Sequence, residues 1–247
     1  MKKHRYYCDN EGINPTNENI SIKWGIQLAK EISDIEEICL LIHTKRNTGY
    51  FERVFSPSQL KLLWNGLKLA PEIPPLRIKT LKSLNDFRQT KIVITFGLDS
   101  NEIFQVDDNY SVLGIIAHPW LKDSVLHWAR TWGSKEIISQ AETNTYPLPN
   151  KVVINAFDDL TQSINMSSGI SHWMDEKDCK TYLRALYKYK YTLNENEIFA
   201  YLVREKGWKT EHALDVIKLI EKLNSGGYFQ GGNKTGLQYH IKEWRKK

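Results

Sequence analysis

Four apolar runs in the first half of the chain each end in a short polar cluster. The runs are Tyr6–Cys8, Ile38–Ile42, Ile92–Phe96 and Val112–Ala117. Short apolar runs of this kind are typical of buried strands, and the continuous run at 38–42 predicts burial on both faces of a sheet. Because strands buried on both faces occur mainly in parallel sheets covered by helices, the four runs predict an α/β fold.

Helical patterns separate these runs. Ile20, Trp24 and Leu28 recur every four residues after an Asn-Pro turn, and 121–132 has a similar amphipathic spacing. Ser56-Pro57-Ser58-Gln59 has a capping residue, a proline at the first helical position and a glutamine three residues after the cap, which predicts a helix start. We also expect strands at 50–55 and 76–84, in a sheet of about four or five strands.

The pattern changes to helices alone beyond a linker at 143–150. We expect a helix at 152–164, followed by three helices capped by Asp175, Asn194 and Thr210, and a glycine-rich hairpin at 228–234. Residues 194–236 are similar to a helix-turn-helix with a wing. The sequence therefore predicts a mainly parallel, Rossmann-like α/β domain at 1–145. A small helical, winged-helix-like domain is expected at 146–247.

Composition excludes several classes of protein. Hydrophobic residues make up 41% of the chain and charged residues 26%, which is typical of a globular protein and not of a disordered one. No window approaches the roughly 20 apolar residues of a membrane span, so we expect a cytoplasmic protein without membrane contact. Three cysteines without a Cys-x-x-Cys pair argue against a disulfide framework and a thiolate zinc site.

The polar clusters after the four runs predict a ligand site. In an open parallel α/β sheet the strands end at one edge, and ligands bind there. The predicted catalytic residues are Asp9, His43, Asp99 and His118. The predicted ligand-binding residues are Asn10, Lys45, Ser100 and Trp120. The alternative is that these side chains are ordinary loop residues that mark where buried strands end.

Three of the acidic residues near these strand ends could bind a metal ion. Asp9, Glu11 and Asp99 would supply oxygen ligands for Mg²⁺ or Mn²⁺, as in a metal-dependent nuclease. The alternative is a turn that is stabilised by local Asp and Asn side chains.

The segment after the second run has donors for an anion. His43-Thr44-Lys45-Arg46-Asn47 could hold a phosphate or a carboxylate, and Trp120 offers a surface on which a base could stack. Alternatively, His43 bonds only to a neighbouring carbonyl and Trp120 only packs its loop onto a helix. Standard dinucleotide, P-loop, Gly-x-Ser-x-Gly and His-Glu-x-x-His motifs do not occur.

Positive charge is concentrated in the second half of the chain. Residues 1–147 contain 18 Lys and Arg against 17 Asp and Glu, whereas 148–247 contain 16 against 12. Such a bias permits contact with nucleic acid. The predicted nucleic-acid-binding residues are Lys234, His240, Lys242, Arg245, Lys246 and Lys247. The alternative is a solvated basic tail.

These observations support three hypotheses about function. The first is a nucleic-acid- or nucleotide-handling protein that binds a phosphate-containing ligand at the sheet edge and docks through the basic helical domain. The second is the metal-dependent nuclease. The third is a protein–protein interaction module whose helical domain binds the partner.

Overall fold

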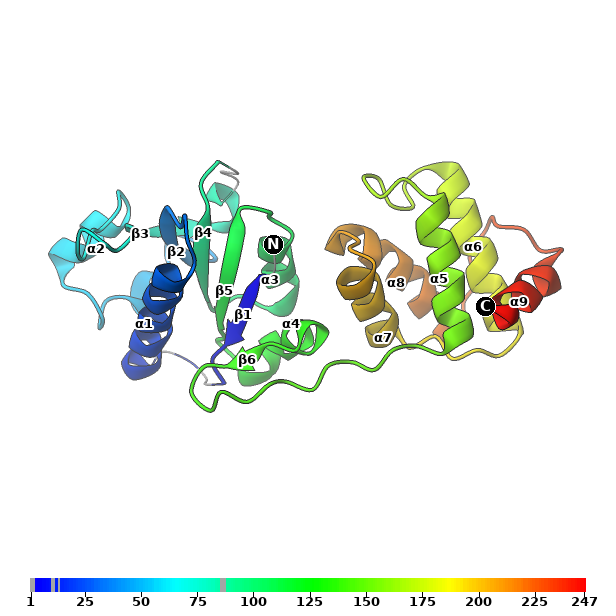
Figure 1. Cartoon of the computed structure of the whole chain (residues 1–247), viewed down its shortest axis with the longest axis horizontal. Helices are drawn as coiled ribbons and strands as arrows, with labels where there is room; N and C mark the ends of the chain where they lie inside the picture. Colours follow the sequence, from blue (N-terminus) through cyan, green and yellow to red (C-terminus); the bar gives the residue numbers. More distant parts are fainter. Residues whose placement is uncertain (1–2, 10–11, 13, 85–87) are drawn as a thin grey trace. The chain divides into compact units, whose positions relative to one another are not determined.

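The computed structural model of the chain describes residues 3–9, 12, 14–84 and 88–247 (Figure 1). The chain divides into two compact units, Met1–Thr145 and Tyr146–Lys247. The first unit contains the sheet, and the second consists of helices and loops. Within the described residues, no helix is both long and apolar enough to cross a membrane.

The first unit is built on a parallel sheet of six strands in the order β3-β2-β4-β5-β1-β6. The strands are β1 (His4–Tyr7), β2 (Glu37–Ile42), β3 (Leu76–Thr80), β4 (Lys91–Phe96), β5 (Val112–His118) and β6 (Lys135–Glu136). The α-helices are α1 (Pro15–Glu31), α2 (Pro57–Leu63), α3 (Ser100–Asp107) and α4 (Leu126–Trp132). Short 3₁₀ turns are η1 (Thr48–Tyr50), η2 (Leu81–Ser83) and η3 (Lys122–Val125). The prediction of a parallel α/β sheet is confirmed.

Helix α1 packs on one face of the sheet, over β4 and β5. Asn14 caps this helix by accepting a hydrogen bond from the backbone of Thr16, and a proline follows at the first helical position. Gly25 lets the helix lie close to the sheet, because a Cβ there would be only 2.6 Å from the side chain of Ile94. The close packing buries the central strands, as the apolar runs predict.

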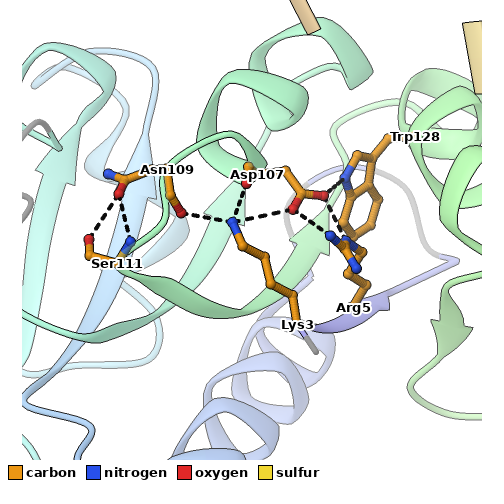
Figure 2. A network of polar contacts seen from close by, with 6 residues as sticks. All are labelled: Lys3, Arg5, Asp107, Asn109, Ser111 and Trp128. Atoms are coloured by element: carbon orange, nitrogen blue, oxygen red, sulfur yellow. Dashed lines mark hydrogen bonds and ion pairs between the residues drawn. The ribbon is translucent and has the colours of Figure 1, made fainter. Parts of the chain in front are cut away.

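The opposite face carries α3 and α4, and a buried polar network joins them to β1 (Figure 2). The Arg5 guanidinium donates from Nε and Nη2 to the two carboxylate oxygens of Asp107, at 2.8 and 2.9 Å. Trp128 Nε1 donates to the same carboxylate at 2.8 Å, and Lys3 Nζ donates to the Asp107 carbonyl. Arg5 also stacks on Trp132, at 3.6 Å from the ring centroid. Since β1 begins here, the network lies near the amino ends of the strands and serves to hold α3 and α4 on the sheet.

The second unit contains α5 (Lys151–Ser163), α6 (Trp173–Lys188), α7 (Glu195–Ala200), α8 (Thr210–Asn224) and α9 (Leu237–Lys246), with a π-helical turn η4 (Tyr201–Glu205) after α7. Trp244 is buried where α9 packs against α5 and α6, and its Nε1 donates to Asp159 at 2.9 Å. Arg184 stacks on Phe229 and donates to the carbonyl of Gly231, which fastens the glycine-rich loop to α6. The prediction of helices in the C-terminal part is confirmed.

The first unit differs from the sequence predictions at three strands. The strand expected at 76–84 ends at Thr80, because the chain turns into η2 directly after it. Residues 50–55 form turns in place of an edge strand, because Phe51 and Phe55 donate backbone hydrogen bonds three and four residues back, to Thr48 and Phe51. The sheet also includes the short strand β6, which raises the number of strands to six. β6 is only two residues long and both are charged, so no apolar pattern in the sequence predicts it.

The helical unit differs in its caps and in its last segment. His172 caps α6 in place of Asp175, and Lys209 occupies the cap position of α8, so that Thr210 is the first helical residue. Residues 228–234 form bends and irregular backbone without a strand, so the predicted hairpin is wrong. The C-terminal segment, for which the alternative to nucleic-acid binding is a solvated basic tail, folds as α9, because Leu237, Ile241 and Trp244 give it a buried face.

Candidate functional site

A pocket of about 300 Å³ opens at the carboxyl ends of β2, β4 and β5. It is lined by His43, Arg46, Asn47, Gly49, Tyr50, Phe96, Gly97 and Trp120. The chain leaves β2 for its outer neighbour β3 and leaves β4 for β5 on the other side, so the connections diverge between β2 and β4. Such a divergence leaves a crevice at the strand ends, which is where open α/β sheets bind ligands.

One wall of the pocket is polar and comes from the loop after β2. Asn47 closes this loop, because its side-chain oxygen accepts from the backbone N–H of Thr44 at 3.1 Å and from its hydroxyl at 2.7 Å. The Arg46 side chain is exposed and forms no ion pair with any described residue. An arginine on a pocket wall without a protein partner can bind an anion through two parallel hydrogen bonds.

The facing wall is aromatic. The Tyr50 ring lies edge-on to Trp120, with centroids 6.0 Å apart, and tilted against Phe96 at 5.5 Å. Trp120 is 48% exposed, so part of its ring is free to contact a ligand. Gly97 has φ +73° and lies against Tyr50, where a Cβ would overlap the phenol hydroxyl. This close approach fixes the tyrosine at the pocket wall.

His43 is held at the pocket by a carboxylate from α3. Its Nδ1 lies 2.6 Å from Glu102 Oε1. The other carboxylate oxygen of Glu102 accepts the backbone N–H of Asp99 at 3.1 Å, as part of a capping box at the start of α3. The ring nitrogen Nε2 of His43 has no hydrogen bond to any described residue, and the side chain, which is 60% exposed, is one of those that line the pocket.

Polar groups are buried next to the aromatic wall. His118, the last residue of β5, has its Nδ1 3.2 Å from the Ser21 hydroxyl, and its ring lies edge-on to Tyr50. Burial lowers the pKa of His118 to about 4, which makes the imidazole neutral at physiological pH, while a backbone interaction with Gly12 acts in the opposite direction. Its Nε2 is buried without a partner among the described residues.

Glu18 on α1 is a second buried group of this kind. Both carboxylate oxygens are buried and without a hydrogen-bond partner in the described part of the chain. Burial raises the pKa of Glu18 to about 7. Burial, and secondarily the charge of Glu18, raises the pKa of Tyr50 to about 12, so the phenol keeps its proton and can act as a hydrogen-bond donor.

Two of the eight residues predicted at the strand ends line the pocket, namely His43 and Trp120, and His118 lies behind its aromatic wall. Lys45 is exposed on the same loop, with its ammonium 5.9 Å from the ring of Trp64, and is not part of the lining. The Ser100 hydroxyl donates to the carbonyl of Ser124 at 2.7 Å and so joins α3 to the next turn. Asn10 lies outside the described residues.

The acidic residues proposed as metal ligands have other partners. Asp9 lies 3.5 Å from the ammonium of Lys122. Asp99 caps α3 and accepts the backbone N–H of Glu102 at 3.0 Å. Glu11 lies outside the described residues. Across 3–9, 12, 14–84 and 88–247, no group of three or more His, Cys, Asp or Glu side chains could hold a metal ion.

Most of the predicted nucleic-acid-binding residues contact other side chains. The pairs are His240 with Trp244, Arg245 with Tyr191, Lys246 with Glu243 and Lys247 with Asp159. Lys234 and Lys242 are exposed and form no ion pair with the described residues. Lys242 shares the outer face of α9 with Tyr239, which is 67% exposed.

Sequence reasoning missed Tyr50, Phe96 and Gly97 as lining residues. Phe96 ends the third apolar run and Gly97 opens its polar cluster, so the strand-end argument covered their location but not their role. Tyr50 carries no local signal, because only the fold brings it over Gly97.

A comparison with protein families finds a match in the second half of the chain. Residues 149–245 match a family described as a domain of unknown function, DUF1889. The match lies within the helical unit and does not include the pocket. No curated protein and no solved structure matches the chain.

Proposed function

We propose that the first unit binds a small nucleotide-like ligand in the pocket between the ends of β2 and β4. The observation that carries the proposal is the pairing of two walls. An arginine that forms no ion pair with any described residue lies on one wall with an asparagine, and three aromatic rings lie on the other. An anionic group and a flat ring in one molecule would use both walls.

The position and size of the pocket support the same ligand class. It lies where the strand connections diverge, and a volume of about 300 Å³ is at the small end of ligand pockets. These features favour a mononucleotide-sized ligand. We also propose that the sheet is Rossmann-like. The pocket lies at the switch point where such sheets bind ligands, although the sequence does not contain the glycine fingerprint.

Calorimetric titration of the full chain tests the proposal. The probes are adenosine and thymidine 5′-monophosphates, with the matching nucleosides and ribose 5-phosphate as partial ligands. We expect the nucleotides to bind more tightly than the nucleosides, which lack the phosphate, and more tightly than ribose 5-phosphate, which lacks the base. Absence of binding by both nucleotides at millimolar concentration would contradict the proposal.

Two variants separate the arginine from general surface charge. Arg46→Gln should weaken nucleotide binding about ten- to a hundredfold, because it removes a charge-assisted hydrogen-bonding group. Lys45→Gln, which removes the neighbouring charge outside the lining, should change the affinity by less than about threefold. Equal losses in the two variants would show that the pocket does not hold the anion.

A second candidate function is nucleic-acid binding by the helical unit. It is favoured by Lys242 and the exposed Tyr239 on the outer face of α9, together with Lys234. This second candidate function includes the proposal that the helical unit is winged-helix-like. A Lys242→Glu variant should weaken the binding of single-stranded DNA at low salt, whereas Lys218→Glu on α8, whose ammonium pairs with Asp215, is the control. No DNA binding by the wild-type chain at low salt would favour the third hypothesis, a protein partner.

A further inference from the structure

We infer that the pocket hydrolyses a phosphate ester of its ligand, with His43 as the general base. This inference rests on the proposed function, because the ligand must first place its phosphate against the wall that carries Arg46. What carries it further is the juxtaposition of His43, at the pocket, with Glu102 from α3.

The His43–Glu102 contact has the geometry of a histidine prepared for proton transfer. A carboxylate oxygen 2.6 Å from Nδ1 favours the ring tautomer with its proton on Nδ1. In that tautomer Nε2 carries a free lone pair. A base with one nitrogen oriented by a carboxylate and the other facing a substrate is a recurring catalytic arrangement.

The orientation of Glu102 does not depend on His43. Its Oε2 accepts the backbone N–H of Asp99, and its own backbone N–H donates to the Asp99 carboxylate. The capping box therefore fixes the carboxylate at the start of α3, and Oε1 is left for the imidazole. Glu102 acts as a positioning residue, since its carboxylate meets the histidine and is not among the groups that line the pocket.

The reaction needs only water as a co-reactant. His43 Nε2 takes a proton from a water molecule while the water oxygen attacks phosphorus. The P–O bond to the leaving group breaks, and its electron pair stays on the leaving oxygen, which receives the proton back from the imidazolium. One water is consumed, and an alcohol and a phosphate group with one substituent fewer are formed. Arg46 would stabilise the charge that develops on the phosphoryl oxygens.

The test uses thymidine 5′-monophosphate p-nitrophenyl ester, a chromogenic diester that carries both a base and a phosphate. We expect the full chain to release p-nitrophenol. His43→Asn should lower the rate by about 100-fold or more, the usual contribution of a general base. His4→Asn changes an exposed histidine at the start of β1, away from the pocket, and should leave the rate unchanged.

Glu102→Gln tests the positioning role without removing the cap, since glutamine also serves at this position of a capping box. The glutamine amide would face Nδ1 as a donor and favour the other tautomer, with the proton on Nε2. Nitrogen NMR of the histidine ring should therefore show the proton on Nδ1 in the wild type and on Nε2 in Glu102→Gln. The rate should fall at least about tenfold, and the acidic limb of the pH–rate profile should move.

Failure of this inference and failure of the proposed function can be told apart. If thymidine 5′-monophosphate binds but the ester is not cleaved, or if cleavage is unaffected by His43→Asn, the general-base role is wrong and the binding site remains. If the nucleotide does not bind, the proposed function fails and this inference fails with it. An unchanged tautomer in Glu102→Gln would overturn the positioning role.

Discussion

Replacing Asp107 by asparagine is the sharpest test of how the first unit is held together. The change keeps the shape of the side chain and removes one negative charge. In the folded protein the Asp107 side chain is 2% exposed and accepts hydrogen bonds from Arg5 and Trp128 (Figure 2). Asparagine has one acceptor oxygen, so its amide group must face a donor of Arg5.

The expected loss is about 3–5 kcal/mol in the free energy of unfolding of the first unit. This is the range for breaking a buried ion pair by removing one partner, because the remaining charge stays buried and uncompensated. The Arg5 side chain is 16% exposed, so water can replace little of the lost interaction. With a urea slope of about 2 kcal/mol/M, the midpoint should fall by about 2 M.

Hydrogen exchange in urea, followed by mass spectrometry of peptides from β1 and β5, measures this stability separately from that of the helical unit. Asp123→Asn is the control, since it removes the same charge from an exposed side chain in η3 and should cost less than about 0.5 kcal/mol. In Arg5→Met/Asp107→Asn the cost should be less than the sum of the single changes. The reasoning is refuted if Asp107→Asn and Asp123→Asn destabilise the unit equally.

Three further predictions concern the pocket. The pKa of His118 is about 4 in the folded state and 6.5 in the unfolded state, so its contribution to stability is complete above pH 6.5 and is lost as the pH falls toward 4. The free energy of unfolding should fall by about 3 kcal/mol over this range. A His118→Asn variant should not show this loss in acid unfolding. The pKa of Glu18 is raised to about 7 from 4.5, so its contribution is complete below pH 4.5 and is lost as the pH rises through 7; Glu18→Gln should therefore be more stable than the wild type at pH 8, and equal stability there would contradict the assignment. Gly97→Ala should destabilise the unit by about 2–4 kcal/mol, because an alanine there would have a positive φ and its Cβ would overlap the Tyr50 hydroxyl. In a double-mutant cycle, Tyr50→Phe should recover part of this loss, and purely additive effects would show that the two residues do not touch.

The helical unit illustrates how far local patterns can be trusted. Asn194 caps α7 as its position in the sequence predicts, because a capping side chain bonds to a backbone N–H only three residues away. His172 caps α6 although Asp175 has the more usual type for that role. The pattern of residues 237–246 does not predict α9, because its buried face of three residues is short and most of its other side chains are charged or polar.

The positions of the central strands and their burial follow from the amino-acid sequence alone. The apolar runs at 38–42, 92–96 and 112–117 lie within β2, β4 and β5, and Cys39 is buried as predicted. The capping box at Ser56 is also present. The capping box follows from interactions between residues that are close in the chain. The burial of the strands follows from the hydrophobicity of the apolar runs. Neither depends on the order of the strands in the sheet.

Which strand ends meet depends on the order of the strands in the folded sheet. Asp9 and His43 both follow apolar runs, yet β1 and β2 are separated in the sheet by β4 and β5, so their polar clusters serve different neighbours. Tyr50 reaches Gly97 across the divergence between β2 and β4, from 47 positions earlier in the chain. Strand order is set by how whole helices cover the sheet, and therefore by the burial of apolar surface over the entire unit. The few residues around each strand end do not contain this information, so they do not predict which strand ends lie side by side.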